Sequence, residues 1–535
     1  MQLTFLGATR MVTGSSYLLE IEQKKILIDC GMFQGSKAIR SLNSRPFPFN
    51  PSEIECVLLT HAHIDHSGLL PKLCKEGFKG KIFATKVTAE LCSIMLPDSA
   101  HIQEFDAEIA NRKGKRAGKD PIIPLYTTED AYACLKQFTE VFYDYDINVL
   151  PQIRVRFREA GHILGSSLLE VWVTEREKTV KFAFSGDLGQ PDQPIIKDPV
   201  YIEEADYIIM ESTYGNRLHE NYDKEEALAK VVTSTFNRGG NVIIPAFAVG
   251  RTQTILYYLH KLFKAKRIPD IPVIIDSPLA ISATDVFVEN VHEYDSEAYD
   301  LFFKEHDDPL HMPQLSFSKT AEESKALNEL DQPTIIISAS GMADAGRILH
   351  HLKHNLWRPE SSILFVGYQA QESLGRRLID GAKRVKILGE EISVRAEIHS
   401  MDGFSAHADQ RQLLDWLQHF TEKPANVFLV HGEIDMAEPF AKLVQDQLAM
   451  TTFIPGYGDS VVIDGRSWRI KTSTIVSINP AIKQLQESLA QFEADYTEYL
   501  RRLEQLSLTD AGKAQDVINR LAKVAAYFKK TMAGL

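Results

Sequence analysis

Residues 61–66 read His-Ala-His-Ile-Asp-His and follow directly on an apolar, strand-like segment that ends at Thr60. Three imidazoles and one carboxylate within six residues are nitrogen and oxygen donors of the kind that zinc prefers. In an extended segment the first two histidines lie on one side, whereas Asp65 and His66 can turn to another. The pattern therefore predicts a metal site, and its geometry suits two ions rather than one.

Further potential metal ligands and acid–base residues stand at the ends of other predicted strands. Asp29 closes a strand at 25–29, His162 follows 155–158, Asp187 follows 180–185, Glu211 closes 207–211 and His431 closes 427–431. Taken singly, each residue is equally well explained as a turn residue or a hydrogen-bonded loop residue. Packing does not explain the whole set, so we expect these side chains to converge on residues 61–66 at one rim of a sheet.

The order of the predicted elements divides the chain into four parts. Residues 1–211 contain short apolar strands, such as Tyr17–Ile21 and Lys81–Thr85, with a few helices between them, which indicates layered β-sheet flanked by helices. Residues 212–390 alternate strand and helix, the pattern of a parallel-sheet α/β domain. In residues 391–478, strands predicted at 395–399 and 427–431 and a hairpin at 464–465 resemble the first part. We therefore interpret the middle domain as an insertion.

Residues 479–535 form the fourth part, in which apolar residues recur at three- and four-residue steps. The repeating positions are Ile482, Leu485, Leu489, Phe492, Tyr496, Leu500 and Leu503, followed after a break by Val517, Leu521, Val524 and Phe528. This spacing predicts two amphipathic helices that form a hairpin. Their apolar stripes need a cover, either the body of the chain or a second copy, so a homodimer is one expectation.

The composition is that of an acidic globular protein. Its 535 residues include 59 Lys and Arg against 72 Asp and Glu, a formal net charge of −13. That balance counts against a protein that coats long nucleic acid without specificity, but it leaves room for a local basic channel. The five cysteines, an odd number without a C-x-x-C pair, do not form a disulfide framework. With no signal-peptide pattern and no run of about 18 apolar residues, we expect a cytoplasmic protein without a membrane segment.

Three glycine-containing loops of the middle domain follow a strand and open a helix, where backbone N–H groups can receive a phosphate. Each loop has an arginine beside it, so we expect the three to line a groove for a polyanion. The predicted phosphate-binding residues are Ser340, Gly341 and Arg347 in one loop, Arg251 in a second and Arg376 in a third. Any one such loop is as readily explained as a tight turn.

This combination of residues resembles the metallo-β-lactamase fold, and the middle insertion with its later motifs resembles the β-CASP branch, the nucleases that process RNA. The likeness covers about residues 1–465, and no motif position departs from it. The matching positions are Asp29, His61-x-His63-x-Asp65-His66, His162 and Asp187 for the first four motifs, and Glu211, His407 and His431 for motifs A, B and C. Histidine at motif C is expected of members that process RNA rather than DNA. The endonuclease subunit of the pre-mRNA 3′-end cleavage factor and its bacterial relatives are the closest likeness, and ribonuclease J is a more distant one.

The resemblance implies an α/β protein with an αββα sandwich, an inserted parallel-sheet β-CASP domain and a C-terminal helical hairpin. It also implies two zinc ions, the first held by His61, His63, His162 and Asp187, and the second by Asp65, His66, Asp187 and His431. Two ions that share a carboxylate activate a water and neutralise charge on a phosphate. Asp65 would thus serve catalysis as well as metal binding, and Asp29 would orient a ligand.

The family pattern also implies a general acid. His407, kept protonated by Glu211, would give its proton to the leaving oxygen, and Ser405 of the same motif is assigned to the substrate phosphate. A capping or structural role is the alternative for His407. The basic run 111–119 is interpreted as a solvated loop or, alternatively, as a wall of the entrance for RNA.

The function implied is a zinc-dependent ribonuclease that hydrolyses single-stranded RNA, endonucleolytically, leaving 5′-phosphate and 3′-hydroxyl ends. The alternative within this class is a 5′-to-3′ exoribonuclease like ribonuclease J. A small-molecule metallohydrolase, such as a lactonase or thioesterase, is a second alternative, against which the large insertion argues. A catalytically silent scaffold subunit is a third, and the filled ligand positions argue against it.

Overall fold

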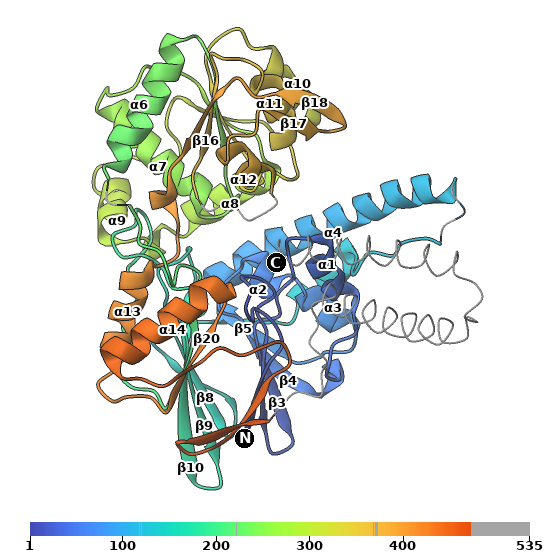
Figure 1. Ribbon diagram of the computed structural model, residues 1–535, viewed down its shortest axis with the longest axis vertical. Coiled ribbons are helices and arrows are strands. Elements are labelled where there is room, and N and C mark those ends of the chain that lie inside the picture. The colour runs from blue at the N-terminus through green and yellow to red at the C-terminus, as the bar shows by residue number, and fades with distance from the viewer. Residues whose placement is uncertain (117, 119, 221, 368, 370–372, 472–535) are drawn as a thin grey trace, which may run out of the picture. The chain divides into compact units, whose positions relative to one another are not determined.

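The computed structural model describes residues 1–471 apart from 117, 119, 221, 368 and 370–372. The predicted helical hairpin at 479–535 therefore lies outside the described residues. Within them, two large sheets face each other, and a third sheet belongs to an α/β portion inserted between their strands (Figure 1).

The first sheet has eight strands and combines both ends of the described chain. In spatial order it contains β23 (Ser467–Lys471), β22 (Ser460–Asp464), β1 (Gln2–Phe5), β2 (Tyr17–Ile21), β3 (Lys24–Ile28), β4 (Ile54–Leu58), β5 (Lys81–Thr85) and β6 (Phe138–Val141). The predicted hairpin at 464–465 is confirmed, because β22 and β23 pair antiparallel around it, and β22 also pairs with β1.

The second sheet has seven strands, and several of the predicted site residues follow its strands. In spatial order it contains β21 (Thr452–Phe453), β20 (Asn426–Val430), β11 (Tyr207–Glu211), β10 (Lys178–Phe184), β9 (Ser167–Glu175), β8 (Ile153–Glu159) and β7 (Asp146–Leu150). β11 pairs in parallel with both β10 and β20, so the carboxyl ends of these three strands meet at one edge. β20 enters the sheet only after the whole inserted portion.

Apolar side chains that alternate along the strands fill the space between the two sheets. Leu3 and Phe5 of β1 and Phe182 and Phe184 of β10 are buried in this shared core. The rings of Phe5 and Phe428, one from each sheet, have their centroids 5.2 Å apart. Burying one face of each sheet in this way fixes the register of every strand, because a shift by one residue would turn its apolar face outward.

Helices cover the outer faces of both sheets. On the first sheet lie α2 (Ile64–Ser67), α3 (Leu70–Lys75), α4 (Lys86–Lys115) and α5 (Thr128–Leu135), and the short α1 (Lys37–Arg40) precedes them. On the second lie α13 (Gln410–Gln418) and α14 (Ile434–Leu448), whose Trp416 and Phe440 are buried against the strands. The predicted αββα sandwich is confirmed.

The inserted portion is a six-stranded sheet in which every pair is parallel. Its order is β14 (Leu315–Phe317), β13 (Val273–Ile275), β15 (Ile335–Ser338), β12 (Val242–Pro245), β16 (Ser362–Phe365) and β19 (Glu397–Ser400). The helices that alternate with them are α6 (Lys224–Asn237), α7 (Arg251–Lys264), α8 (Pro278–Glu289), α9 (Ser296–Phe303), α10 (Ala321–Ala326), α11 (Ile348–Asn355) and α12 (Leu374–Ile379). Apolar side chains bury both faces of this sheet, as parallel sheets require.

Two expectations from the sequence are wrong at the edges of these elements. The strand predicted at 395–399 was grouped with the first part, but β19 pairs with β16, and Ile398 lies opposite Ile363 in the inserted sheet. That sheet therefore extends past residue 390, beyond the small hairpin of β17 (Arg384–Ile387) and β18 (Glu390–Ser393). The basic run was expected to be a loop, but its residues 111–115 form the end of α4, since the Arg and Lys residues there favour helix.

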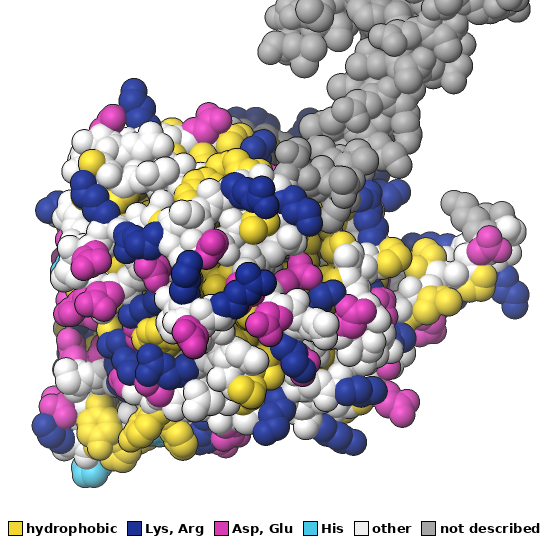
Figure 2. All heavy atoms as spheres, turned by 90° about the horizontal axis from the view of Figure 1, so that it is seen from below, with side chains coloured by type: hydrophobic (Ala, Val, Ile, Leu, Met, Phe, Trp, Pro, Cys, Tyr) yellow, Lys and Arg dark blue, Asp and Glu magenta, His cyan; other side chains and the backbone are white. Residues whose placement is uncertain are grey.

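The surface of the sandwich shows no segregation of charge on the side away from the inserted portion. Figure 2 shows basic and acidic side chains interspersed over this face among the described residues. Several are paired, including Lys178 with Asp464 and Arg154 with Asp146. No helix among the described residues combines the length and the apolar character needed to cross a membrane.

Candidate metal centre

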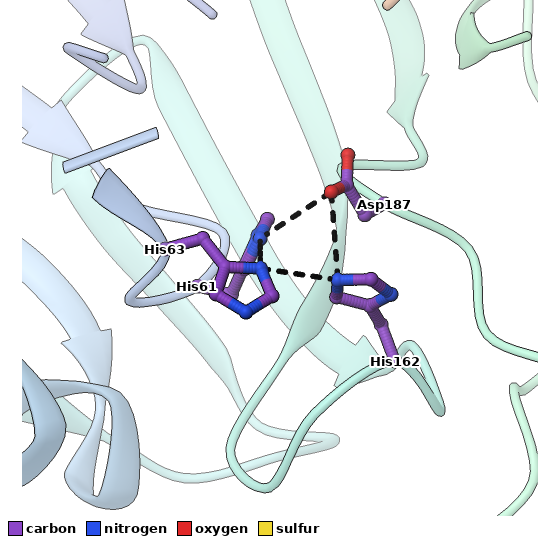
Figure 3. A group of neighbouring side chains, drawn as sticks. All are labelled: His61, His63, His162 and Asp187. Carbon is purple, nitrogen blue, oxygen red and sulfur yellow. Dashed lines mark hydrogen bonds and ion pairs between the residues drawn. The ribbon is translucent and has the colours of Figure 1, made fainter. Parts of the chain in front are cut away.

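Four predicted ligands meet at the carboxyl ends of the strands in a single cluster. Figure 3 shows His61, His63, His162 and Asp187 turned toward one point, from the loop after β4, the loop between β8 and β9, and the end of β10. His63 Nδ1 lies 3.1 Å from His61 Nε2 and 3.2 Å from His162 Nε2. Asp187 Oδ2 lies 3.5 Å from Nε2 of both His61 and His162. We call these four residues the first ligand group.

A second ligand group lies beside the first and shares its aspartate. Asp65, His66 and His431 bring one donor atom each within 4.8 Å of one another. His431 Nε2 lies 3.4 Å from Asp65 Oδ2, and His66 Nε2 lies 3.2 Å from Asp187 Oδ1. The two oxygens of Asp187 therefore face different groups, Oδ2 the first and Oδ1 the second.

Asp29 contacts the second ligand group through the ring nitrogen of His66 that faces away from Asp187. It follows β3 with a left-handed backbone, at φ 57°, and its Oδ2 lies 2.7 Å from Nδ1 of His66. The backbone N–H and the hydroxyl of Thr60 donate to the same carboxylate, at 2.8 and 2.9 Å. Because Asp29 occupies Nδ1 of His66, the other ring nitrogen is the one presented to Asp187.

The donor atoms suit metal ions better than they suit one another. In tetrahedral zinc with bonds of about 2.0–2.1 Å, ligand atoms lie about 3.3 Å apart, close to the nitrogen spacing of the first ligand group. Burial lowers the pKa of His61 and His162 well below the usual range and that of His63 to about 4, so these imidazoles are neutral ligands. Asp187 Oδ1 is buried and accepts no well-aligned hydrogen bond among the described residues, although His66 Nε2 lies 3.2 Å away. This donor set fits zinc.

A third cluster places His407 beside the first two. His407 Nδ1 lies 3.1 and 3.2 Å from the two carboxylate oxygens of Glu211, and its Nε2 lies 4.0 Å from Asp187 Oδ2. Burial alone lowers the pKa of His407, but the carboxylates of Glu211 and Asp187 outweigh it and raise the pKa to about 9. His407 therefore carries a proton at neutral pH. Its side chain is 21% exposed, against 2% for Asp187.

Glu211 is fixed by the backbone around it. It is fully buried at the end of β11, where the N–H of Leu188 donates to its Oε1 at 2.6 Å. Its own N–H donates to the hydroxyl of Ser185 at 3.0 Å. The carboxylate is thus held in place for His407 rather than being free to turn toward solvent.

The predicted phosphate-binding residues divide into two sets. Two arginines already have partners: Arg347 donates to Asp276 at 2.7 Å and to the carbonyl of Ser318, and Arg376 donates to Asp380 one turn along its helix. A buried aspartate that no local pattern reveals takes up the charge of Arg347, which argues against this arginine as a phosphate ligand. Ser405 stays near the catalytic residues, where its hydroxyl accepts from the N–H of His407 at 3.3 Å.

The remaining predicted phosphate-binding residues lie in two loops, one of which contacts a neighbour of His162. Gly341 approaches Phe247 so closely that a Cβ would lie 3.0 Å from its ring, and Ser340 precedes it in the same loop. Gly250 lies against Ile163, the neighbour of His162, and Arg251 follows it at the start of α7.

Three hydroxyl residues contact the centre and were not predicted. Thr213 Oγ1 lies 3.1 Å from Nδ1 of His431, Thr60 Oγ1 lies 3.1 Å from Nδ1 of His61, and Ser15 Oγ lies 3.3 Å from Nε2 of His66. Ser and Thr are common at strand ends, so their types give no signal. Only the adjacency of Thr60 to the histidine run pointed to one of them.

Comparison with protein families gives three matches in different parts of the chain. Residues 10–93 match the Metallo-beta-lactamase superfamily, and residues 252–378 match the Beta-Casp domain. Residues 391–455 match the Zn-dependent metallo-hydrolase RNA specificity domain. The first match includes residues 61–66, and the last includes both His407 and His431.

Curated relatives align with most of the chain. Ribonuclease TTHA0252 of Thermus thermophilus is 37% identical over 83% of this chain and 96% of its own length. Transcription termination factor FttA of Methanosarcina mazei is 30% identical over 84% of this chain and 70% of its own. The protein of the same name from Methanocaldococcus jannaschii is 28% identical over 86% of this chain and 71% of its own.

Proposed function

Because the chain belongs to the metallo-β-lactamase superfamily, in the branch that carries a Beta-Casp domain, we propose that it is a metal-dependent ribonuclease that hydrolyses phosphodiester bonds of single-stranded RNA. The observation that carries this proposal is the juxtaposition of two ligand groups around Asp187 with a protonated His407 beside them. The family match to an RNA specificity domain and the names of the relatives support RNA as the substrate.

The proposed cofactors are two zinc ions. The first ligand group would hold one ion, and the second ligand group together with Asp187 would hold the other. Bound there, the ions would supply Lewis-acid activation of a water molecule and neutralise negative charge on the phosphate. Asp29, Thr60 and Thr213 keep the imidazoles in place for this purpose, each through an Nδ1 atom.

His407 is the proposed general acid. Nδ1 bonds to Glu211, which leaves Nε2 to donate a proton to the oxygen that leaves phosphorus. Glu211 does not touch the substrate in this scheme, because it is fully buried, and it acts by keeping His407 charged and correctly turned. The hydroxyl of Ser405 lies beside the same histidine and is proposed to contact the phosphate.

Replacing Glu211 with glutamine is expected to move the alkaline limb of the pH–rate profile. The variant keeps the oxygen that accepts from Leu188 but loses the charge that raises the pKa of His407. Burial then lowers this pKa, so cleavage should fall at a lower pH than in the wild type. The measurement is kcat across about pH 6 to 10. The exposed Glu438→Gln variant is the control, and an unmoved limb would show that Glu211 does not set the charge of His407.

The proposed mode is endonucleolytic, and it can be separated from 5′-to-3′ exonucleolytic decay. Single-stranded RNA labelled at either end, with its 5′ end free or chemically blocked, distinguishes the two by product length. Internal products from blocked RNA support the endonuclease, whereas protection by the block supports the exonuclease alternative.

A strong chelator tests the metal requirement in the same assay. We expect it to abolish cleavage and expect zinc alone to restore it, because every proposed step depends on water activation at the two ligand groups. Elemental analysis should find close to two zinc ions per chain in active protein. Full cleavage by protein freed of metal would exclude this function.

A further inference from the structure

Two basic side chains stand at the start of neighbouring helices in the inserted portion. Lys224 is the first residue of α6 and Arg251 the first residue of α7, and the two helices pack against each other. The pKa values of both side chains are lowered, chiefly by burial, that of Arg251 to about 10, and the positive charge of Arg251 contributes to the shift at Lys224. Two cations therefore share one partly desolvated place.

Neither cation has an acidic partner among the described residues. Arg251 Nε is buried and accepted by no oxygen there, and no ion pair involves Lys224. The neighbouring basic residues differ: Lys261 and Arg267 both pair with Glu225, the residue next to Lys224. An acid is thus available on α6 but serves other cations. A desolvated cation without a partner is costly unless an anion arrives to compensate it.

Aromatic rings and a glycine line the place where the two cations lie. Lys224 Nζ lies 5.9 Å from the centroid of the Phe404 ring, and the rings of Phe404 and Tyr258 meet edge to face at 5.2 Å. Gly403 leaves room for the lysine, since a Cβ there would lie 3.2 Å from Lys224 Cε. Because Phe404 is itself buried, the rings pack around the lysine and lower the polarity of its surroundings rather than offer a face to a base.

This place adjoins the catalytic residues. Gly403 and Phe404 lead directly into Ser405 and His407, so Lys224 packs on the segment that carries the proposed acid. Tyr214 links the two regions, because its ring lies 6.2 Å from that of His407 and its hydroxyl acts on the pKa of Arg251. The two cations therefore border the segment that leads to the proposed acid.

We propose that Lys224 and Arg251 together bind one phosphate of the RNA strand next to the scissile bond. The inference rests on the proposed function and names a subsite of it. Arg251 alone was expected to contact phosphate from its loop, whereas Lys224 carries no sequence signal, since a lysine at the start of a helix is ordinarily a solvated residue. The phosphate can be an internal diester or a terminal monophosphate, and the charge chemistry is the same.

Lys224→Gln and Arg251→Gln, each in the His407→Ala background so that RNA stays intact, test the site by binding. We expect about tenfold weaker affinity for each variant. The slope of log Kd against log salt should fall by about 0.7 per variant, as for one lost contact with a single strand. Lys224→Arg keeps the charge and should retain affinity. Lys230→Gln, an exposed lysine on the same helix, and Arg395→Gln are the matched controls and should leave Kd and slope unchanged.

RNAs with a 5′-phosphate, with a 5′-hydroxyl and in circular form identify the source of the phosphate. If the glutamine variants lose the same affinity for all three RNAs, the bound phosphate is an internal diester. If they lose affinity only for the RNA with a 5′-phosphate, it is a terminal monophosphate. An unchanged salt slope in both glutamine variants, with unchanged zinc content and thermal stability, would overturn the proposal. RNA cleavage by the wild-type protein is measured separately. If the wild type cleaves no RNA but the glutamine variants still show a reduced salt slope, the proposed function is refuted and the phosphate site stands.

Discussion

Replacing Asp187 with alanine is expected to remove both zinc ions and to reduce RNA cleavage by about 10⁴-fold or more, the loss typical of a group on which all others depend. Asp187 Oδ2 lies 3.5 Å from His61 and His162, and Oδ1 lies 3.2 Å from His66, so one side chain completes both ligand groups.

Elemental analysis together with cleavage of labelled RNA checks this prediction. Asp446→Ala, which removes an exposed carboxylate from α14, is the control and should keep both metal and activity. An Asp187→Ala protein that cleaves RNA at the normal rate with one or two zinc ions would show that the carboxylate does not bridge the groups.

Replacing His407 with alanine is expected to slow cleavage by about 10²–10⁴-fold while leaving the zinc content unchanged, because a general acid supplies a proton and no bond to metal. His431→Ala should instead lose zinc, since its Nε2 faces Asp65 within the second ligand group, at 3.4 Å. The two histidines are close in space, with ring centroids 6.0 Å apart. A difference in zinc content between the two variants would therefore reflect their different roles and not their distance from the site.

Zinc content and single-turnover cleavage of both variants decide the matter, with the exposed His292→Ala as control. Equal loss of zinc from both variants would mean that His407 is a ligand. Normal cleavage by His407→Ala would mean that another group supplies the proton.

The sandwich and its rim could be predicted because the ends of strands are visible in the sequence. Tyr17–Ile21, Lys81–Thr85 and Tyr207–Glu211 have the predicted bounds in the structure, since short β-rich runs end where polar and turn residues begin. Donor residues just beyond such ends reach one rim because the strands there are parallel. The helix α3 starts at Leu70, because Pro71 fits only the first turn of a helix.

Pairing between distant segments could not be predicted in the same way. Nothing in the composition of β19 says that it joins β16 rather than a strand of the sandwich, since a four-residue strand carries no mark of its neighbour. Arg347 illustrates the same limit for side chains. Its partner Asp276 lies 71 residues away in sequence, and an arginine beside a glycine-rich turn has the same local sequence whether it binds phosphate or aspartate.

The parallel pairing of β20 with β11 has a consequence for the order in which the site is completed during translation. His431 follows β20 and meets Asp65, which stands 366 residues earlier in the sequence. A ribosome releases the chain from its N-terminus, so all of the first ligand group is synthesised long before this histidine appears. A nascent or truncated chain that ends before β20 contains the first ligand group but lacks His431. If it ends before residue 407, it lacks His407 as well. Hydrolytic competence is thus acquired late in translation, when the inserted portion has already been made.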